Sequence, residues 1–300
     1  MANLRDIRRR ISGIRSTSKI TQAMKLVAAA KLRRAQETII SARPYAASLR
    51  ALMAHLMPRI DRTAMPLLAE RPEIGNVLLV IVTADRGMCG PFNTNIIRLA
   101  TKRIHETYKD KYEAGQVQLF CIGRRGYQHF IKRDYNVVGK QIGITASATI
   151  VEAQNIVSEI LAGYLGGEFD KVEVIYNEFK SVVQQKLIVE DFLPLPSEPV
   201  PMIEFGGHQF HEFVDYIYEP SERELMEYLV PKHLNFQLLR VLFESNASEQ
   251  GARMTAMDAA TTNARDLISS LQLQYNRARQ EKITKELIEI VGGAEALSAA

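Results

Sequence analysis

The sequence contains little of what a secreted, membrane-spanning or metal-binding protein needs. It has no tryptophan and only two cysteines, Cys89 and Cys121, which form neither a C-x-x-C pair nor a metal-ligand pattern. Two isolated cysteines are typical of a reducing compartment. The longest apolar run, 77–82, is far too short to cross a bilayer, and no apolar segment follows the first charges as in a secretory signal. We therefore expect a cytoplasmic chain.

Motifs for nucleotide binding and for catalysis are also missing. The fingerprints G-x-G-x-x-G and G-x-x-x-x-G-K-[ST], which let the backbone approach phosphates, do not occur, and Gly87 and Gly90 lack that spacing. Cys89, between these glycines, has no histidine partner by spacing. Asp85 and Arg86 are interpreted as a local ion pair that shapes the same turn. We expect no catalytic residue, no metal and no cofactor, and hence a scaffold domain without an active site.

The C-terminal stretch 253–291 contains neither glycine nor proline and is predicted as one helix, bounded by Gly251 and by Gly292 and Gly293. Its expected seam, with alternating spacings of three and four, comprises Met257, Ala260, Ala264, Leu267 and Leu271. A polar collar at 272–280 follows, and apolar residues then return at Ile283, Leu287 and Ile290. We expect this helix to leave its partner helix at the collar and to meet something polar.

The N-terminal stretch supplies the expected partner helix. Its near-heptad seam comprises Leu4, Ile7, Ile11, Ile14, Thr21, Met24, Ala28, Leu32, Ala35 and Ile39. Pro44 is expected to kink or interrupt this arm before a helical pattern resumes over 45–57. Two such arms at opposite ends of the chain indicate an antiparallel coiled coil, with Met24 and Ala28 expected near the distal half of the C-terminal arm.

Basic residues are concentrated near the N-terminus, although the net charge of the whole chain is only +4. Residues 1–34 contain ten lysines and arginines and one acid, Asp6. Such a surface suits a polyanion or an acidic protein lining, but it is also typical of a solvated helix face. Nucleic acid is the rival partner, and no helix-turn-helix, zinc finger or alternation of aromatic and basic residues supports it.

Between the arms, strands alternate with helices. The expected strands are 76–83, 117–122, 171–177 and 185–192, and the expected helices are 94–111, 127–133 and 148–165. Ser221 and Glu224 form a capping-box pattern that begins a further helix. The predicted fold class is α/β plus long α, an antiparallel coiled coil of N- and C-terminal helices with a central Rossmann-like α/β domain. The predicted segments are 1–58 (N-terminal coiled-coil helix), 73–205 (central α/β domain) and 206–300 (foot segment and C-terminal coiled-coil helix).

Four stretches, taken together, closely resemble the gamma-subunit family of F-type ATP synthases, of bacterial type. They are DIRRRISGIRSTSKITQAMKLVAAAKLRRAQ, IVTADRGMCGPFN, YIYEP and the C-terminal run from ASEQGARMTAM through LQYNRARQ to IVGGAEAL. They cover both ends and the middle of the chain in the right order. Gly251 departs from the alanine common in the family, which suggests a flexible joint.

The resemblance implies a non-catalytic rotor subunit, one copy per complex, of a proton- or sodium-transporting two-sector ATP synthase. The terminal helices would form a shaft inside a hexamer of alpha and beta subunits, and the α/β domain would lie near the epsilon subunit and the membrane c-ring. The implied location is peripheral, on the cytoplasmic face of the bacterial inner membrane. Membrane contact would pass only through the c-ring, and no nucleic acid is implied.

The resemblance also assigns contacts to individual residues. In YNRARQ, Arg279 and Gln280 match an Arg–Gln pair that holds a loop of one beta subunit at a time; the alternative is a solvated patch in which Arg279 pairs with Glu281 or Glu286. Further beta-subunit contacts are expected at Arg253, a weaker candidate, and at Met24.

In YIYEP, Tyr218 and Glu219 are expected to touch polar loops of the c-ring, and the alternative is an edge strand of the α/β domain.

Two rival functional classes each rest on a single feature of the sequence. A nucleic-acid-associated coiled coil rests on the basic start, and an α/β oxidoreductase rests on the sheet alone, against which the missing glycine fingerprint counts.

Overall fold

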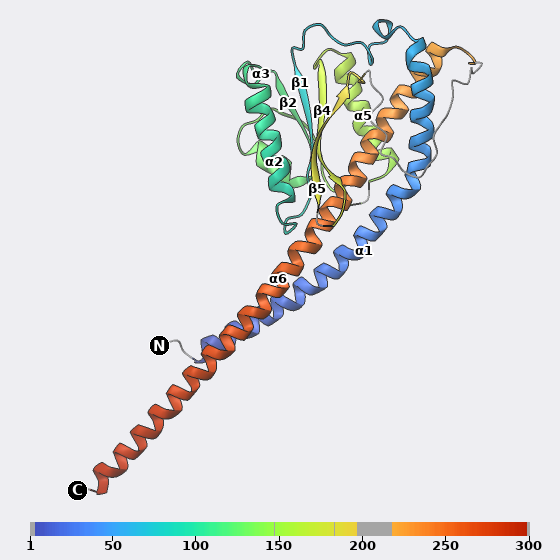
Figure 1. Cartoon of the computed structure of the whole chain (residues 1–300). Helices are drawn as coiled ribbons and strands as arrows, with labels where there is room; N and C mark the ends of the chain where they lie inside the picture. The colour runs from blue at the N-terminus through green and yellow to red at the C-terminus, as the bar shows by residue number, and fades with distance from the viewer. Residues whose placement is uncertain (1–3, 147, 183, 197–217, 299–300) are drawn as a thin grey trace. The chain divides into compact units, whose positions relative to one another are not determined.

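The computed structural model describes residues 4–146, 148–182, 184–196 and 218–298 (Figure 1). Contacts divide the chain into a unit of Met1–Ala29 with Arg253–Ala300, here called the two-helix unit, and a unit of Ala30–Ala252, called the α/β unit. Two long helices, α1 (Leu4–Leu56) and α6 (Glu222–Ser298), contribute residues to both. A search of the described residues finds no helix with the length and apolar content that a membrane span requires.

Both long helices continue past residues that were expected to interrupt or bound them. Helix α1 runs through Pro44, and α6 runs through Gly251 and on to Ser298, so the expected helix bounds at 253–291 are wrong. A proline removes one backbone hydrogen bond but leaves the flanking turns intact if packing supports them. Beyond Pro44, Leu49 is buried, and the following turns of α1 also pack into the core.

The sheet of the α/β unit has five strands in the order β3-β2-β1-β4-β5. The strands are β1 (Val77–Val82), β2 (Val117–Ile122), β3 (Val137–Gln141), β4 (Lys171–Phe179) and β5 (Gln185–Leu193). Strands β1 to β4 pair in parallel, and β5 is antiparallel to β4. The predicted Rossmann-like topology is confirmed. Strand β3 was not predicted, because it is short, half-exposed and contains Gly139 and Lys140 in place of an apolar run.

Residues of β1 alternate between two buried clusters, one on each face of the sheet. One face is covered by α2 (Phe92–Lys102) and α4 (Arg124–Ile131), and the other by α5 (Ile150–Leu165) together with the parts of α1 and α6 that belong to this unit (Figure 1). The short helices are η1 (Met57–Arg59), η2 (Arg62–Ala64), η3 (Arg103–Thr107) and α3 (Lys109–Glu113). The sheet is therefore the middle layer of three.

A π-helical turn, η3, interrupts the predicted helix over 94–111. In an α-helix, residues five apart point about 140° apart, whereas the wider π turn brings them closer to one face. Here Arg103 donates two bonds to the Glu173 carboxylate, at 2.8 and 2.9 Å, and the Tyr108 hydroxyl donates a third at 2.5 Å. Burial would raise the pKa of Glu173, but these donors and Lys171 hold it below its usual value. The π turn thus lets one helical segment satisfy a fully buried carboxylate.

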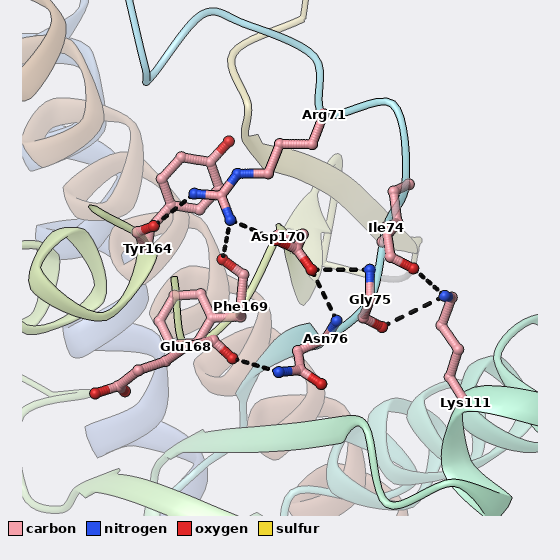
Figure 2. Close-up of polar contacts among 9 residues, drawn as sticks. All are labelled: Arg71, Ile74, Gly75, Asn76, Lys111, Tyr164, Glu168, Phe169 and Asp170. Carbon is pink, nitrogen blue, oxygen red and sulfur yellow. Dashed lines mark hydrogen bonds and ion pairs between the residues drawn. The ribbon is translucent and has the colours of Figure 1, made fainter. Parts of the chain in front are cut away.

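The connection between η2 and β1 is fixed to the sheet by one carboxylate, in what we call the Asp170 clamp (Arg71, Gly75, Asn76 and Asp170; Figure 2). Asp170 accepts the backbone N–H groups of Gly75 and Asn76 at 2.8 and 2.9 Å and pairs with the Arg71 guanidinium. Arg71 also donates to the carbonyl of Tyr164 at 2.7 Å, near the C-terminus of α5. The clamp therefore joins the connection, α5 and the start of β4.

Candidate functional site

The two-helix unit holds α1 and α6 in one antiparallel register. Polar contacts between described side chains of the two helices include Arg8 with Tyr275 (2.5 Å), Thr21 with Thr261 (2.7 Å) and Lys25 with Asp258 (2.6 Å). In each pair the two residue numbers add up to 282 or 283, as one antiparallel register requires. The predicted antiparallel pairing of the two arms is confirmed.

The same register corrects where the first arm meets the second. It places Met24 level with residue 259 and Ala28 level with 255, near the start of the arm at 253–291. The expectation that both lie near the distal half of that arm is wrong. The reason is that α6 extends past the start of α1, so that the distal part of the arm at 253–291 has no described residue of α1 beside it.

The seam of α6 differs from the predicted one by one residue at two positions. Its buried residues in this unit include Met257, Thr261, Ala264 and Leu271. Predicted seam residue Leu267 is 42% exposed, and Ala260 is only partly buried. Thr261 was not predicted in the seam because threonine is a polar residue and the seam was predicted from the spacing of apolar residues.

Beyond the end of α1, α6 continues without that partner. The register places Leu4, the first described residue of α1, level with residue 279. From 280 to the end of the described chain, no described residue of α1 lies level with α6, and the side chains described there are exposed. The predicted emergence of the helix at the polar collar therefore agrees with the structure.

Arg279 and Gln280 lie at the point of emergence, and both are exposed. Within the described part of the chain, Arg279 makes no ion pair, and Glu286 pairs with Lys282 at 3.4 Å instead. Apolar residues follow on this projecting segment, where Ile283 is 47% exposed. An exposed guanidinium beside an amide, on a helix without a neighbour, offers several donors to an external acceptor.

The other predicted contact residues do not join Arg279 in one site. By register, Met24 lies about 30 Å from residue 279 along the helix, at 1.5 Å per residue. Arg253 lies further still and is buried, with 9% exposure. The predicted beta-subunit contacts are thus spread along the two-helix unit, and their roles stay predictions.

At the other predicted contact, Tyr218 and Glu219 directly precede α6. Tyr218 is partly buried and packs against the main core of the α/β unit, whereas Glu219 is exposed. The Ser221 hydroxyl accepts the backbone N–H of Glu224 at 3.2 Å, as the capping pattern predicted. The first two residues of YIYEP, 216 and 217, lie outside the described residues.

The turn after β1 is shaped differently from the expected ion pair. The Asp85 carboxylate accepts the backbone N–H groups of Arg124 and Gly143, both at 3.0 Å, and the Thr145 hydroxyl at 2.9 Å. The interpretation of Asp85 and Arg86 as a local ion pair is wrong. Backbone donors outcompete Arg86 because they are already fixed in place by the ends of neighbouring strands.

The two cysteines are buried. Cys89 is 1% exposed, and its sulfur accepts from the Asn93 amide at 3.1 Å. Burial raises the pKa of the Cys121 thiol to about 12, so this thiol stays protonated. A search of the described residues finds no cluster of side chains that could hold a metal ion.

In a sheet of this strand order, nucleotides bind outside the carboxyl ends of the strands, where the order reverses between β1 and β4. Here Gly251 of α6 lies against Phe179, the last residue of β4, since a Cβ added at Gly251 would be 3.5 Å from the Phe179 ring. Ala252 belongs to the same buried cluster as Ala84 and Cys89, which follow β1. Helix α6 thus packs where a ligand would otherwise enter.

A second charged network, which the sequence did not reveal, joins α6 to β5. Arg240 donates two bonds to the Glu190 carboxylate, at 2.6 and 2.7 Å, and Gln237 and Tyr176 donate to the same group. Burial would raise the pKa of Glu190, but Arg240 holds it below its usual value. Glu244, one turn along α6, has a raised pKa because it is buried and has only a 3.3 Å contact with Arg240. Arg240 and Glu190 are 50 positions apart, so no local sequence spacing could have predicted their contact.

Comparisons with known proteins agree across the whole chain. The family model described as ATP synthase matches residues 3–297. The chain is 53% identical to the ATP synthase gamma chain of Chloroherpeton thalassium and 52% identical to that of Chlorobium luteolum, with 99% of both sequences covered in each case.

Solved structures with a similar fold come from a mitochondrial ATP synthase. The rotor of the Euglena gracilis enzyme in rotational state 1 has a TM-score of 0.62 at 18% identity, covering 93% of this chain and 98% of that one. A chain from its OSCP/F1/c-ring structure in rotational state 3 has a TM-score of 0.66 at 20% identity, covering 99% and 95%. At these identities the likeness shows the fold alone. The sequence matches decide against the nucleic-acid and oxidoreductase alternatives.

Proposed function

This chain belongs to the ATP synthase gamma-chain family, and we propose that its two long helices transmit torque between a membrane c-ring and a catalytic hexamer of alpha and beta subunits. One copy per complex turns with the c-ring and the epsilon subunit. The chain couples the passage of protons or sodium ions to ATP synthesis or hydrolysis, while catalysis stays on the beta subunits.

The observation that carries this proposal is the projecting segment of α6. It leaves α1 near residue 279, and its described side chains are exposed. The apolar side chains that return beyond the polar collar fit a bearing in which the end of a shaft turns, while Arg279 and Gln280 supply the few directional contacts. Charge-assisted bonds contribute on the order of 1.5 to 3 kcal/mol each, enough to favour one angle and still break at every turn.

The remaining contacts follow the same logic. Met24 and Arg253 would meet beta subunits nearer the base of the shaft, and the exposed basic side chains of α1 would face acidic segments of those subunits. Tyr218 and Glu219 would meet polar loops of the c-ring. The chain would then touch the membrane only through that ring, on the cytoplasmic face of a bacterial inner membrane.

Rotation of the assembled complex tests the proposal. The hexamer is fixed to a surface, and a bead is attached to the exposed position 109 through Lys109→Cys. We expect ATP-driven rotation in one direction, and a bead that stays still while the complex hydrolyses ATP would overturn the proposal. Calorimetry of the chain alone should show no micromolar binding of ATP.

A further inference from the structure

The end of α1 and the start of α6 meet at a junction within the α/β unit. Met57 and Ile60, which lie on either side of Arg59 in and just after η1, pack against the same core as Tyr218 and Leu225. Two segments far apart in the sequence therefore pack against the same hydrophobic core. The exposed Glu219 follows Tyr218 directly in the sequence.

Arg59 adds polar contacts to this junction. Its guanidinium carbon lies 5.5 Å from the centre of the Tyr218 ring, at the distance of a cation–π contact. One nitrogen of the same group lies 3.6 Å from a carboxylate oxygen of Glu222, in the first turn of α6. A planar guanidinium can stack on a ring and pair with a carboxylate at once, which a lysine ammonium cannot do in the same geometry.

The residues that follow Arg59 hold the backbone in place. The Arg62 guanidinium donates to the carbonyl of Leu68 at 3.1 Å and to that of Leu195 at 2.8 Å. The Asp61 side chain accepts the backbone N–H of Thr63 at 3.0 Å and caps η2. Arg59 thus extends from a fixed backbone, so that its side chain can restrain Tyr218.

We propose that Arg59 is a positioning residue that holds Tyr218 and Glu219 in place for the c-ring, by stacking on the Tyr218 ring while it pairs with Glu222. The inference rests on the proposed contact of Tyr218 and Glu219 with the c-ring. Arg59 itself need not touch the ring. Its loss would leave the fold of the sheet intact and loosen only the segment that carries Glu219.

The first measurement uses the whole chain alone, with a nitroxide spin label at Glu219→Cys. Cys89 and Cys121 are 1% and 0% exposed, so the label should report on position 219. In Arg59→Met we expect a more mobile label, because the methionine keeps apolar bulk and loses both polar contacts. Arg59→Lys should be intermediate. Arg223→Met is the matched control, because Arg223 is an exposed arginine nearby that pairs within α6 with Glu227 at 3.0 Å.

The second measurement is ion pumping per ATP hydrolysed, in membrane vesicles that carry the whole complex. We expect Arg59→Met to lower this ratio about twofold or more while ATP hydrolysis persists, and Arg223→Met to match the wild type. Combining Arg59→Met with Tyr218→Leu should lower the ratio little further, because both changes remove the same contact.

The outcomes separate this inference from the function on which it rests. If Glu219→Lys leaves the pumping ratio unchanged, the proposed c-ring contact fails. If Glu219→Lys lowers the ratio and Arg59→Met does not, the role of Arg59 fails alone. The role of Arg59 also fails if the label at position 219 is equally mobile with and without Arg59→Met, whatever the pumping ratio.

Discussion

The hydroxyl groups of Thr21 and Thr261 lie 2.7 Å apart in the seam between α1 and α6, where each residue is less than 9% exposed. Thr21 also lies 3.0 Å from the carbonyl of Ser18, and Thr261 lies 2.7 Å from that of Met257. Two hydroxyl protons serve these three contacts, so one hydroxyl donates across the seam while the other donates to its own helix. Removing either hydroxyl therefore removes the hydrogen bond that these two residues share across the seam.

We expect Thr21→Val to lower the free energy of unfolding by about 1 kcal/mol, because it removes one partner of a buried hydrogen bond. The double variant with Thr261→Val should lose less than the two single variants added together, since each single change already removes the bond that the two hydroxyls share across the seam. Urea denaturation of the four proteins measures this coupling. Additive losses would show that the hydroxyls do not depend on each other.

The sequence predicted what repeats locally and missed what depends on distant partners. The parallel strands were found because β1 and β2 are apolar over their whole length, and the two arms because their apolar residues recur at helical spacing. The interruption considered at Pro44 does not occur, and the expected boundary at Gly251 was wrong, because packing supports the helices through both.

Gly251 provides a second prediction. A Cβ added there would lie 3.5 Å from the Phe179 ring, which is ordinary van der Waals contact. Gly251→Ala should therefore raise the free energy of unfolding by about 0.5–1 kcal/mol, because alanine has less backbone freedom to lose in a helix. The matched control is Gly163→Ala in α5, where the added Cβ would lie 2.6 Å from the buried Phe169 ring. This control should destabilise by about 1–3 kcal/mol, and a destabilised Gly251→Ala would contradict the prediction.

A third prediction concerns acid. Burial would raise the pKa of Asp170, but Arg71 and the backbone N–H groups of Asn76 and Gly75 hold it below the ordinary value of 3.8. The charged carboxylate therefore contributes stability that is complete above about pH 4 and is lost as pH falls through the lower folded pKa. We expect Asp170→Asn to be about 1–3 kcal/mol less stable than the wild type at pH 7, with the gap closing below pH 4. Urea midpoints between pH 7 and pH 3 measure it, and a constant gap would exclude this linkage.

Glu244 should show the opposite dependence. Burial and the charges of Glu178 and Glu190 raise its pKa above 4.5, against the attraction of Arg240. Its folded state favours the protonated carboxyl, so stability is lost as pH rises from about 4.5 through the raised folded pKa. Glu244→Gln keeps a neutral group of similar shape and should gain on the wild type as pH rises through that window. An advantage that stays flat with pH would mean that Glu244 does not titrate as its burial indicates.

For the site, sequence resemblance named Arg279 and Gln280 as contact residues, which stays a prediction. Arg279 lies level with Leu4, the first described residue of α1, and Gln280 lies one residue beyond it, so the polar collar ends where the described partner helix ends. Resemblance did not reveal Arg59, because its role depends on Tyr218 and Glu222, more than 150 residues away. A short sequence motif carries no information on which distant side chain contacts it.

The last prediction concerns Arg279 and Gln280 themselves. Adjacent residues on a helix point about 100° apart, so the two side chains can reach different acceptors of one partner loop. Arg279→Leu and Gln280→Leu should each lower steady-state ATPase of the assembled complex about twofold or more without dissociating it, because each removes bonds that favour one angle. Arg277→Leu is the matched control, since it removes the same exposed charge about 200° around the helix from Arg279. Equal losses of ATPase activity in Arg277→Leu and Arg279→Leu would mean that this part of α6 contributes only its net positive charge. Wild-type turnover in both Arg279→Leu and Gln280→Leu would mean that the point of emergence is a solvated surface.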